Sequence, residues 1–147
     1  PVPVYISIAT ISSRIQNVHL IVCDLLRGEA VPDRIFVVTS AKPFLLDRGV
    51  SPLALPRPLV ALAAKLAHNR SHHVSHHDHF SQTDLQDQRE YPPGTVKVSV
   101  TIVRTNSSLG PHRKLLPLLS RVWGRDVAVL VMDDDTRVAP SYLARFA

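Results

Sequence analysis

Three consecutive aspartates, Asp133, Asp134 and Asp135, follow a short apolar run at residues 129–132. Adjacent carboxylates repel one another, and none can be buried cheaply without a compensating partner. A divalent cation is such a partner, because Mg²⁺ or Mn²⁺ binds one or two carboxylates together with substrate phosphates. In an extended segment Asp133 and Asp135 point to one side and Asp134 to the other. We therefore expect the outer pair to hold a metal and Asp134 to bind another group, such as a sugar hydroxyl.

The simplest alternative is a solvated acidic turn between a strand and a helix. In that case Asp135 would help to cap the helix that follows, and the three carboxylates would bind nothing. Both interpretations place the aspartates between a strand and a helix.

Segments with strand patterns alternate along the chain with segments with helix patterns, and these elements would position the aspartates. Four segments with β-branched or alternating apolar residues are expected to be strands: residues 4–10, 34–40, 95–105 and 126–132. Three segments with apolar residues at helical spacing are expected to be helices: residues 15–28, 58–67 and 114–123, with Pro140 opening a last one. This alternation predicts an α/β fold with a mostly parallel sheet flanked by helices. Ligands of such sheets bind beyond the carboxyl ends of the strands, which is where the aspartates lie.

Two of these elements carry more detailed expectations. The strand at residues 126–132 is apolar on both faces, which is typical of a central parallel strand covered on each side. In the helix at residues 114–123, one stripe should be buried: Leu115, Leu118, Leu119 and Val122. Pro117 fits that helix only in its first turn, where backbone N–H groups lack partners.

The composition is that of one globular domain. The 147 residues are 45% hydrophobic and 20% charged, which is enough to bury a core. The net charge of +5 is scattered and aromatic residues make up only 5%, so a nucleic-acid partner is not expected. The lone Cys23 excludes an internal disulfide and a cysteine-based zinc site. Neither a membrane-spanning segment nor a signal peptide is visible, and we expect the chain to be a piece of a longer protein.

Residues 69–94 are polar and biased in composition, and we expect a flexible insertion there. Six histidines lie in or beside it: His68, His72, His73, His76, His77 and His79. Their spacing would suit Zn²⁺, Cu²⁺ or Ni²⁺, but a solvated linker is the favoured interpretation.

Three segments together resemble a known family. Residues 127–146, VAVLVMDDDTRVAPSYLARF, resemble the DxD region of nucleotide-sugar-dependent glycosyltransferases of the GT-A fold. They are particularly similar to the exostosin-like group, glycosyltransferase family 64. Residues 105–119, TNSSLGPHRKLLPLL, and residues 4–14, VYISIATISSR, are similar to the segments of that family that approach the nucleotide.

The resemblance implies a role for each matching residue. Asp135 would coordinate Mn²⁺ or Mg²⁺ bridging the two phosphates of a UDP-sugar, and Asp133 would support the metal or the donor sugar. Asp134 would bind ribose or sugar hydroxyls. The remaining expected nucleotide-binding residues are Arg14 and Asn106, with Arg113 or Lys114 on the diphosphate.

The resemblance also implies what lies around this chain. It would be the Rossmann-like, nucleotide-binding half of a GT-A glycosyltransferase that transfers a sugar to a hydroxyl of a glycan or glycoprotein acceptor. The catalytic carboxylate and the acceptor site would belong to the following half. A membrane anchor outside this chain would place the enzyme in the Golgi or endoplasmic reticulum.

Two other functions remain open. One is a non-catalytic fragment or pseudoenzyme that binds a nucleotide and a metal. The other, less favoured, is a haloacid-dehalogenase-type phosphotransferase, whose apolar strand also ends in Asp-x-Asp. Arg137 stands where that motif has Thr or Val, and the aspartates follow the fourth expected strand instead of the first.

Overall fold

The computed structural model describes residues 2–68, 98–105 and 109–146. Its strands are β1 (Val4–Ala9), β2 (Arg34–Ser40), β3 (Ser99–Thr105) and β4 (Ala128–Asp133). Its α-helices are α1 (Val18–Leu26), α2 (Arg57–His68) and α3 (Leu116–Val122). Short 3-10 helices complete the set: η1 (Ile15–Asn17), η2 (Pro52–Ala54), η4 (Gly110–Lys114) and η5 (Leu143–Arg145).

The four strands form one parallel sheet in the order β3-β2-β1-β4. This confirms the α/β fold that the alternation of elements predicts. The chain places β2 and β3 on one side of β1 and then crosses back to place β4 on the other. The same order begins the doubly wound Rossmann sheet, whose ligand crevice lies where the strand order reverses. In this sheet that point lies between β1 and β4, where Ala9 is the register partner of Asp133.

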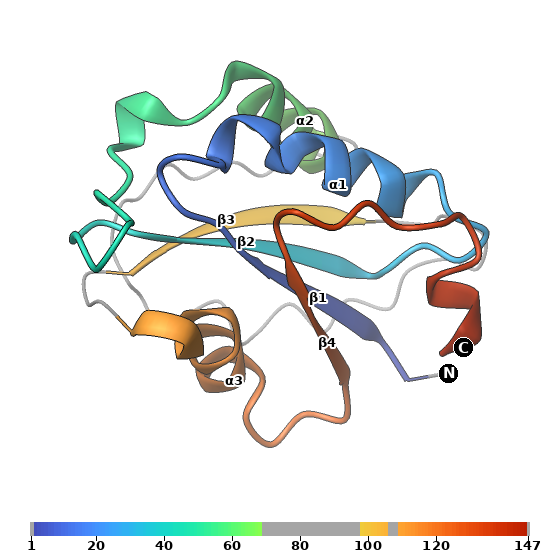
Figure 1. Cartoon of the computed structure of the whole chain (residues 1–147). Coiled ribbons are helices and arrows are strands. Elements are labelled where there is room, and N and C mark those ends of the chain that lie inside the picture. Colours follow the sequence, from blue (N-terminus) through green and yellow to red (C-terminus); the bar gives the residue numbers. More distant parts are fainter. Residues whose placement is uncertain (1, 69–97, 106–108, 147) are drawn as a thin grey trace.

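Helices cover both faces of the sheet (Figure 1), with α1 and α2 on one face and α3 on the other. The larger core lies beneath α1 and α2, and its fully buried members include Ile6, Ile8, Val18, Val22, Leu25, Ile35, Val37 and Leu59. The smaller core lies beneath α3 and comprises Tyr5, Phe36, Val38, Val103, Leu118 and Val122. Alternate residues of β1 and β2 therefore serve opposite cores, as the pleat of a strand requires.

The helix α3 agrees with its sequence pattern in most respects. Pro117 lies in the first turn, as expected, and Leu118 and Val122 are buried. The expectation that Leu115 belongs to the buried stripe is wrong, because this side chain is 38% exposed. The reason is that α3 begins only at Leu116, so Leu115 belongs to the junction with η4 and does not follow the helical repeat.

The expectation that β4 is a central strand is wrong for the sheet formed by the described residues. β4 lies at one edge of that sheet, and Val131 remains 36% exposed. The smaller core beneath α3 is built on β1, β2 and β3, and it reaches β4 only through partly buried Val129. An apolar pattern on both faces therefore overstated how fully this strand is covered.

The expected last helix at Pro140 is also wrong. The chain forms a turn there, and only a short 3-10 helix, η5, follows. The segment after β4 instead runs back beside α1 (Figure 1), and the carbonyl of Pro140 accepts a hydrogen bond from the N–H of Glu29 at 2.9 Å. Val138, Tyr142 and Leu143 pack on the larger core, which holds the backbone in this extended path.

Several predicted features lie outside the described residues. They are the insertion at 69–94, Asn106 and five of the six clustered histidines, while His68 is the last residue of α2. Within the described ranges, none of the helices has the length and apolar character needed to cross a membrane.

Candidate functional site

The three aspartates lie where the strand order reverses. Asp133 is the last residue of β4, and Asp134 and Asp135 form the turn that follows. The adjacent strand β1 ends at Ala9, and its chain continues through Thr10 to Arg14 before η1 begins. The aspartates and the loop after β1 therefore flank the position at which parallel α/β sheets bind ligands.

Arg14 contacts two of the aspartates. Its Nη1 donates a hydrogen bond of 2.6 Å to Oδ2 of Asp135, and both side chains are about half exposed. Its Nε lies 3.1 Å from Oδ1 of Asp134. Arg14 and Asp135 are 121 positions apart in the sequence, and the pairing of β1 with β4 brings them together.

Lys114 contacts the third aspartate. Its Nζ donates a hydrogen bond of 2.8 Å to Oδ1 of Asp133. Lys114 is the last residue of η4, and η4 lies beside β1 and β2. Arg14, expected near the nucleotide, and Lys114, one of the two residues expected on the diphosphate, therefore both lie at the aspartates, where they compensate part of the negative charge of the carboxylates.

Asp134 differs from its two neighbours because it is buried. It is only 4% exposed, whereas Asp133 and Asp135 face solvent, as the alternation of an extended segment predicts. Neither of its carboxylate oxygens accepts a hydrogen bond from the described residues. The Arg14 Nε–H is close enough for Coulombic attraction but is not aimed along a hydrogen bond, so we count the contact as an ion pair only. A buried carboxylate without hydrogen bonds is costly, which points to a ligand or water that completes it.

A second buried polar group, just after the end of β1, also lacks a partner in the described part of the chain. Thr10 is fully buried, and its Oγ1 also lacks a hydrogen-bond partner among the described residues. The register pairs Ala9 with Asp133, so the next residues of the two chains, Thr10 and Asp134, lie on the same side of the sheet. Two buried polar groups without hydrogen bonds to the described residues therefore follow the ends of β1 and β4 on this side of the sheet.

Arg113 has a different partner from the one expected. Its Nη1 donates a short hydrogen bond to Oδ2 of Asp47, a residue that is 3% exposed. Oδ1 of Asp47 also accepts hydrogen bonds of 3.0 Å from the N–H groups of Ser12 and Gly49. Burial raises the pKa of the Asp47 carboxyl, but the bonds from Arg113, Ser12 and Gly49 outweigh burial and hold that pKa below its usual value. Asp47 thereby ties three loops at the carboxyl edge of the sheet together.

Asp47 was not among the residues selected from the sequence. It lies in a proline-rich segment without periodicity, and its only local signal is the turn-forming Asp-Arg-Gly at residues 47–49. A turn signal does not indicate which distant cation the side chain meets, so the pairing with Arg113 had no counterpart in the sequence pattern.

A further ion pair holds the segment that leaves the aspartates. Arg137 donates two hydrogen bonds to the carboxylate of Asp24 on α1, one of them 2.7 Å long between Nη2 and Oδ1. The side-chain hydrogen bond from Arg137 lowers the pKa of Asp24. This contact, with the Pro140–Glu29 hydrogen bond, joins residues 137–140 to α1 and to the turn that follows it.

No protein-family model, no curated protein and no solved structure matches this chain. The site is therefore interpreted from its own geometry.

The side chains fit a metal that also binds phosphate. Among the described residues, no three His, Cys, Asp or Glu side chains are placed to hold an ion by themselves. Mg²⁺ and Mn²⁺ do not need such a set when substrate phosphates and water supply the other ligands. Asp133 and Asp135 present exposed carboxylate oxygens at a strand end, beside two cations that suit phosphate, so their chemistry is compatible with this requirement.

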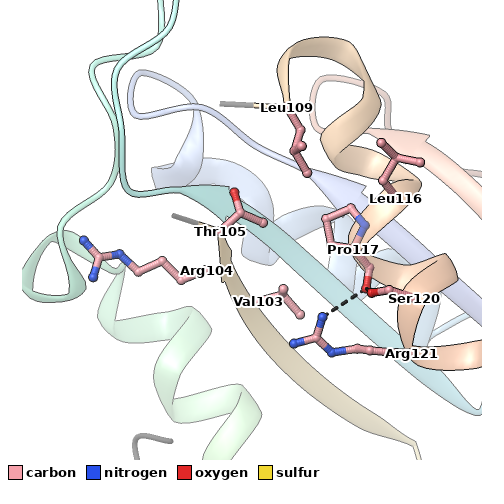
Figure 2. Close-up of a pocket in the computed structure, with 8 residues that line it drawn as sticks. All are labelled: Val103, Arg104, Thr105, Leu109, Leu116, Pro117, Ser120 and Arg121. Atoms are coloured by element: carbon pink, nitrogen blue, oxygen red, sulfur yellow. Dashed lines mark hydrogen bonds between the residues drawn. The ribbon is translucent and has the colours of Figure 1, made fainter. Parts of the chain in front are cut away.

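A separate groove lies at the end of β3 and does not include the aspartates. Its volume is about 340 Å³, and it runs between β3 and α3. Figure 2 shows its lining residues: Val103, Arg104, Thr105, Leu109, Leu116, Pro117, Ser120 and Arg121. The groove is mainly apolar and lies beyond β2, on the opposite side of β1 from β4. We therefore do not assign it to the aspartate site.

Proposed function

We propose that this chain is the nucleotide-binding half of a metal-dependent glycosyltransferase whose donor is a nucleotide diphosphate sugar, with UDP-sugar as the first candidate. The observation that carries the proposal is the meeting of Arg14, Lys114 and the three aspartates at the point where the strand order reverses. Carboxylates for a divalent ion and cations for phosphate are the two sets of groups that a metal–diphosphate complex needs.

The residues have distinct roles in this proposal. Asp135 and Asp133 bind the metal, and Arg14 and Lys114 bind phosphate oxygens. Asp134 accepts hydrogen bonds from ribose or sugar hydroxyls, which is supported by its buried oxygens without hydrogen bonds. Arg113 is held by Asp47 and contributes positive charge to the same edge of the sheet.

The chemistry that follows is electrostatic. Departure of the nucleotide from the sugar leaves negative charge on the β-phosphate, and a bound divalent ion acts there as a Lewis acid. Lys114 and Arg14 add fixed positive charge beside the leaving phosphate, which stabilises the transition state more than the ground state. Two parts of the proposal rest on the resemblance to the exostosin-like group alone. They are the acceptor, a glycan or glycoprotein hydroxyl, and the base that activates it.

A second candidate, a module that binds a metal–nucleotide complex without transferring sugar, uses the same contacts. The described groups at the crevice are all suited to binding, so this candidate shares every expectation for nucleotide affinity. It differs only in that no sugar transfer follows when the chain is assayed within its full-length protein with UDP-sugars.

The test of nucleotide binding compares thermal unfolding of the wild type with that of Asp135→Asn, each with and without UDP and Mn²⁺. A ligand that binds only the folded state raises the unfolding temperature. At a free ligand concentration 100 times its Kd, the free energy of unfolding increases by about 2.7 kcal/mol. We expect this shift in the wild type and its loss in Asp135→Asn. Asp126→Asn, an exposed aspartate in the loop before β4, is the matched control and should keep the shift. A full shift in Asp135→Asn would contradict the assignment of Asp135 as a metal ligand.

A further inference from the structure

The loop after β2 contains a tight hairpin whose tip consists of two exposed leucines. Phe44 and Asp47 exchange two backbone hydrogen bonds, of 2.8 and 2.9 Å, so Leu45 and Leu46 alone form the tip. Each of these two leucines is 89% exposed. A single exposed leucine is common on a protein surface, but two adjacent ones at the end of a turn form an apolar tip that the fold itself does not use.

The tip also has a strained backbone. Leu45 has a φ angle of 50°, and it is the only residue other than glycine with a positive φ in the described ranges. This conformation disfavours a side chain with a Cβ, and tight turns usually have Gly, Asn or Asp there. Strained residues of this kind are found where the surrounding structure enforces them, often at functional positions. Neither burial nor backbone preference explains a leucine at position 45.

The base of the hairpin is firmly held. Asp47 is buried and paired with Arg113, and its Oδ1 accepts two backbone hydrogen bonds. The ring of Phe44 lies against Gly110 of η4. The tip is therefore presented on a base that is already ordered, so a contact made by the two leucines costs little further ordering of the chain.

The exposed charges beside the tip are all positive. Lys42 precedes the hairpin and Arg48 follows it, and both are exposed. Neither side chain has an ion-pair or hydrogen-bond partner among the described residues. The only acidic residue between positions 41 and 57 is Asp47, which is buried and neutralised by Arg113. The hairpin thus combines an apolar tip with cations on both flanks and has no exposed acid.

We propose that the tip formed by Leu45 and Leu46 inserts into the surface of a bilayer that contains anionic lipids. Lys42 and Arg48 then lie at the level of the headgroups. A bilayer offers an apolar layer beneath negatively charged headgroups, which matches the order of apolar tip and cationic flanks. Two leucines and two cations give a weak, reversible contact and not a stable anchor. This inference does not depend on the proposed function, because it involves none of the aspartates.

The contact would also orient the crevice toward the lipid. The hairpin follows β2 and the aspartates follow β4, and the carboxyl ends of these parallel strands share one edge of the sheet (Figure 1). Arg113, which holds the base of the hairpin, is next in sequence to Lys114, which contacts Asp133. A ligand in the crevice would therefore be bound close to the membrane surface.

Co-sedimentation with lipid vesicles tests the proposal. The wild type should bind vesicles of phosphatidylcholine with phosphatidylserine, bind phosphatidylcholine alone less, and lose affinity as salt is added. The double variant Leu45→Asn/Leu46→Asn should bind at least about 10-fold less. Asparagine tolerates a positive φ, so this variant should unfold at the same temperature or a higher one. A purely structural role of the leucines would instead lower the unfolding temperature.

Two single variants serve as controls. Trp123→Ser removes a larger apolar side chain, 84% exposed, from the loop before β4 at the opposite edge of the sheet, and it should keep vesicle binding. Arg48→Gln removes one flanking charge, so binding to vesicles with phosphatidylserine should fall by about 5-fold. Its binding to phosphatidylcholine alone should not change.

Insertion is distinguished from adsorption by a fluorescent residue at the tip. In a chain that carries Trp123→Phe, Leu46→Trp leaves one tryptophan, and lipids brominated on their acyl chains should quench it. Binding without quenching would overturn the insertion, because charge alone would then hold the chain at the surface. The quenching and the Arg48→Gln comparison still decide the question if the double variant unfolds at a lower temperature.

Three further results would overturn the proposal. One is equal vesicle binding by the wild type and the double variant, and another is an equal loss of binding in Trp123→Ser. The third is a wild type that ignores vesicles but self-associates in a way that the double variant abolishes. That result would assign the tip to a contact between proteins.

Discussion

The guanidinium of Arg113 is paired with the buried carboxylate of Asp47, 66 residues earlier in the chain. Through its other oxygen, Asp47 holds the N–H groups of Ser12 and Gly49. One carboxylate thus joins the loop after β1, the loop after β2 and the 3-10 helix η4. These loops carry or adjoin Arg14 and Lys114, so the geometry of the aspartate site depends on a residue that does not touch it.

Asp47→Asn should therefore destabilise the fold. The substitution keeps the shape of the side chain but leaves Arg113 without its counter-ion in a largely dry environment. Removing one partner of a buried ion pair costs on the order of 3–5 kcal/mol, and we expect about 3 kcal/mol because Arg113 keeps some contact with water. Urea unfolding at neutral pH measures this loss. Asp126→Asn should remain close to the wild type, and an equal loss in both variants would contradict the importance of the pair.

The stability contributed by Asp47 should also depend on pH. Its pKa is lower in the folded chain than in the unfolded one, where it is about 3.9. Its stabilising contribution is therefore complete above that value and is lost as the pH falls through the lower, folded value. Between pH 6 and pH 3, the free energy of unfolding of the wild type should fall more steeply than that of Asp47→Asn. Parallel pH profiles for the two proteins would show that Asp47 is not linked to folding in this way.

The smaller core should depend strongly on one leucine of α3. Leu118 is 1% exposed and packs with Tyr5, Phe36 and Val38, so Leu118→Ala should cost about 2–5 kcal/mol through lost contacts and a cavity. Leu116, two residues earlier, is 46% exposed, and Leu116→Ala should change stability by no more than about 0.5 kcal/mol. Denaturant melts of the two variants test this difference, and similar losses would mean that α3 packs in another orientation.

Deletion of residues 71–88 should leave folding and nucleotide binding intact. This stretch has no apolar stripe or strand pattern, and α2 and β3 are complete without it. Shortening a long connection also lowers the entropic cost of closing it slightly. Thermal unfolding with and without UDP and Mn²⁺ measures both properties. A large fall in the unfolding temperature, reproduced in the intact chain by a chelator, would identify the histidine cluster as a structural metal site.

Local pattern predicted the elements well where a strand or helix has one clear apolar period. Residues 34–40 were predicted as a strand from their β-branched run, and β2 has these bounds. β4 was placed correctly along the chain but wrongly in the sheet, because an apolar sequence shows only that a strand can be covered. Which neighbours cover it depends on the positions of α3 and β1, and no residue of β4 encodes those positions.

Several residues at the strand ends could be selected from the sequence, but their contacts could not. The end of an apolar strand located Asp133–Asp135, and the resemblance implied Arg14 near the nucleotide and Arg113 or Lys114 on the diphosphate. Their pairing with carboxylates depends on sequence separations of 19 to 121 residues. Which residues meet across such separations is set by the order of the strands in the sheet and by the loops at their carboxyl ends. A prediction from charge alone also expected the apo cluster to be repulsive, whereas two of its carboxylates are hydrogen-bonded to cations.

The contact between Arg137 and Asp24, which joins the segment after the aspartates to α1, offers a way to detect ligand binding at the aspartates from a distance. Asp135 faces the crevice, and Arg137, two residues later, is bonded to Asp24 on α1. A shift of the turn would therefore alter the Arg137–Asp24 contact on α1, where Asp24 adjoins Cys23, the only cysteine of the chain. A single fluorine label on that thiol would give one resonance whose chemical shift follows filling of the crevice, without a reporter being placed in the crevice itself.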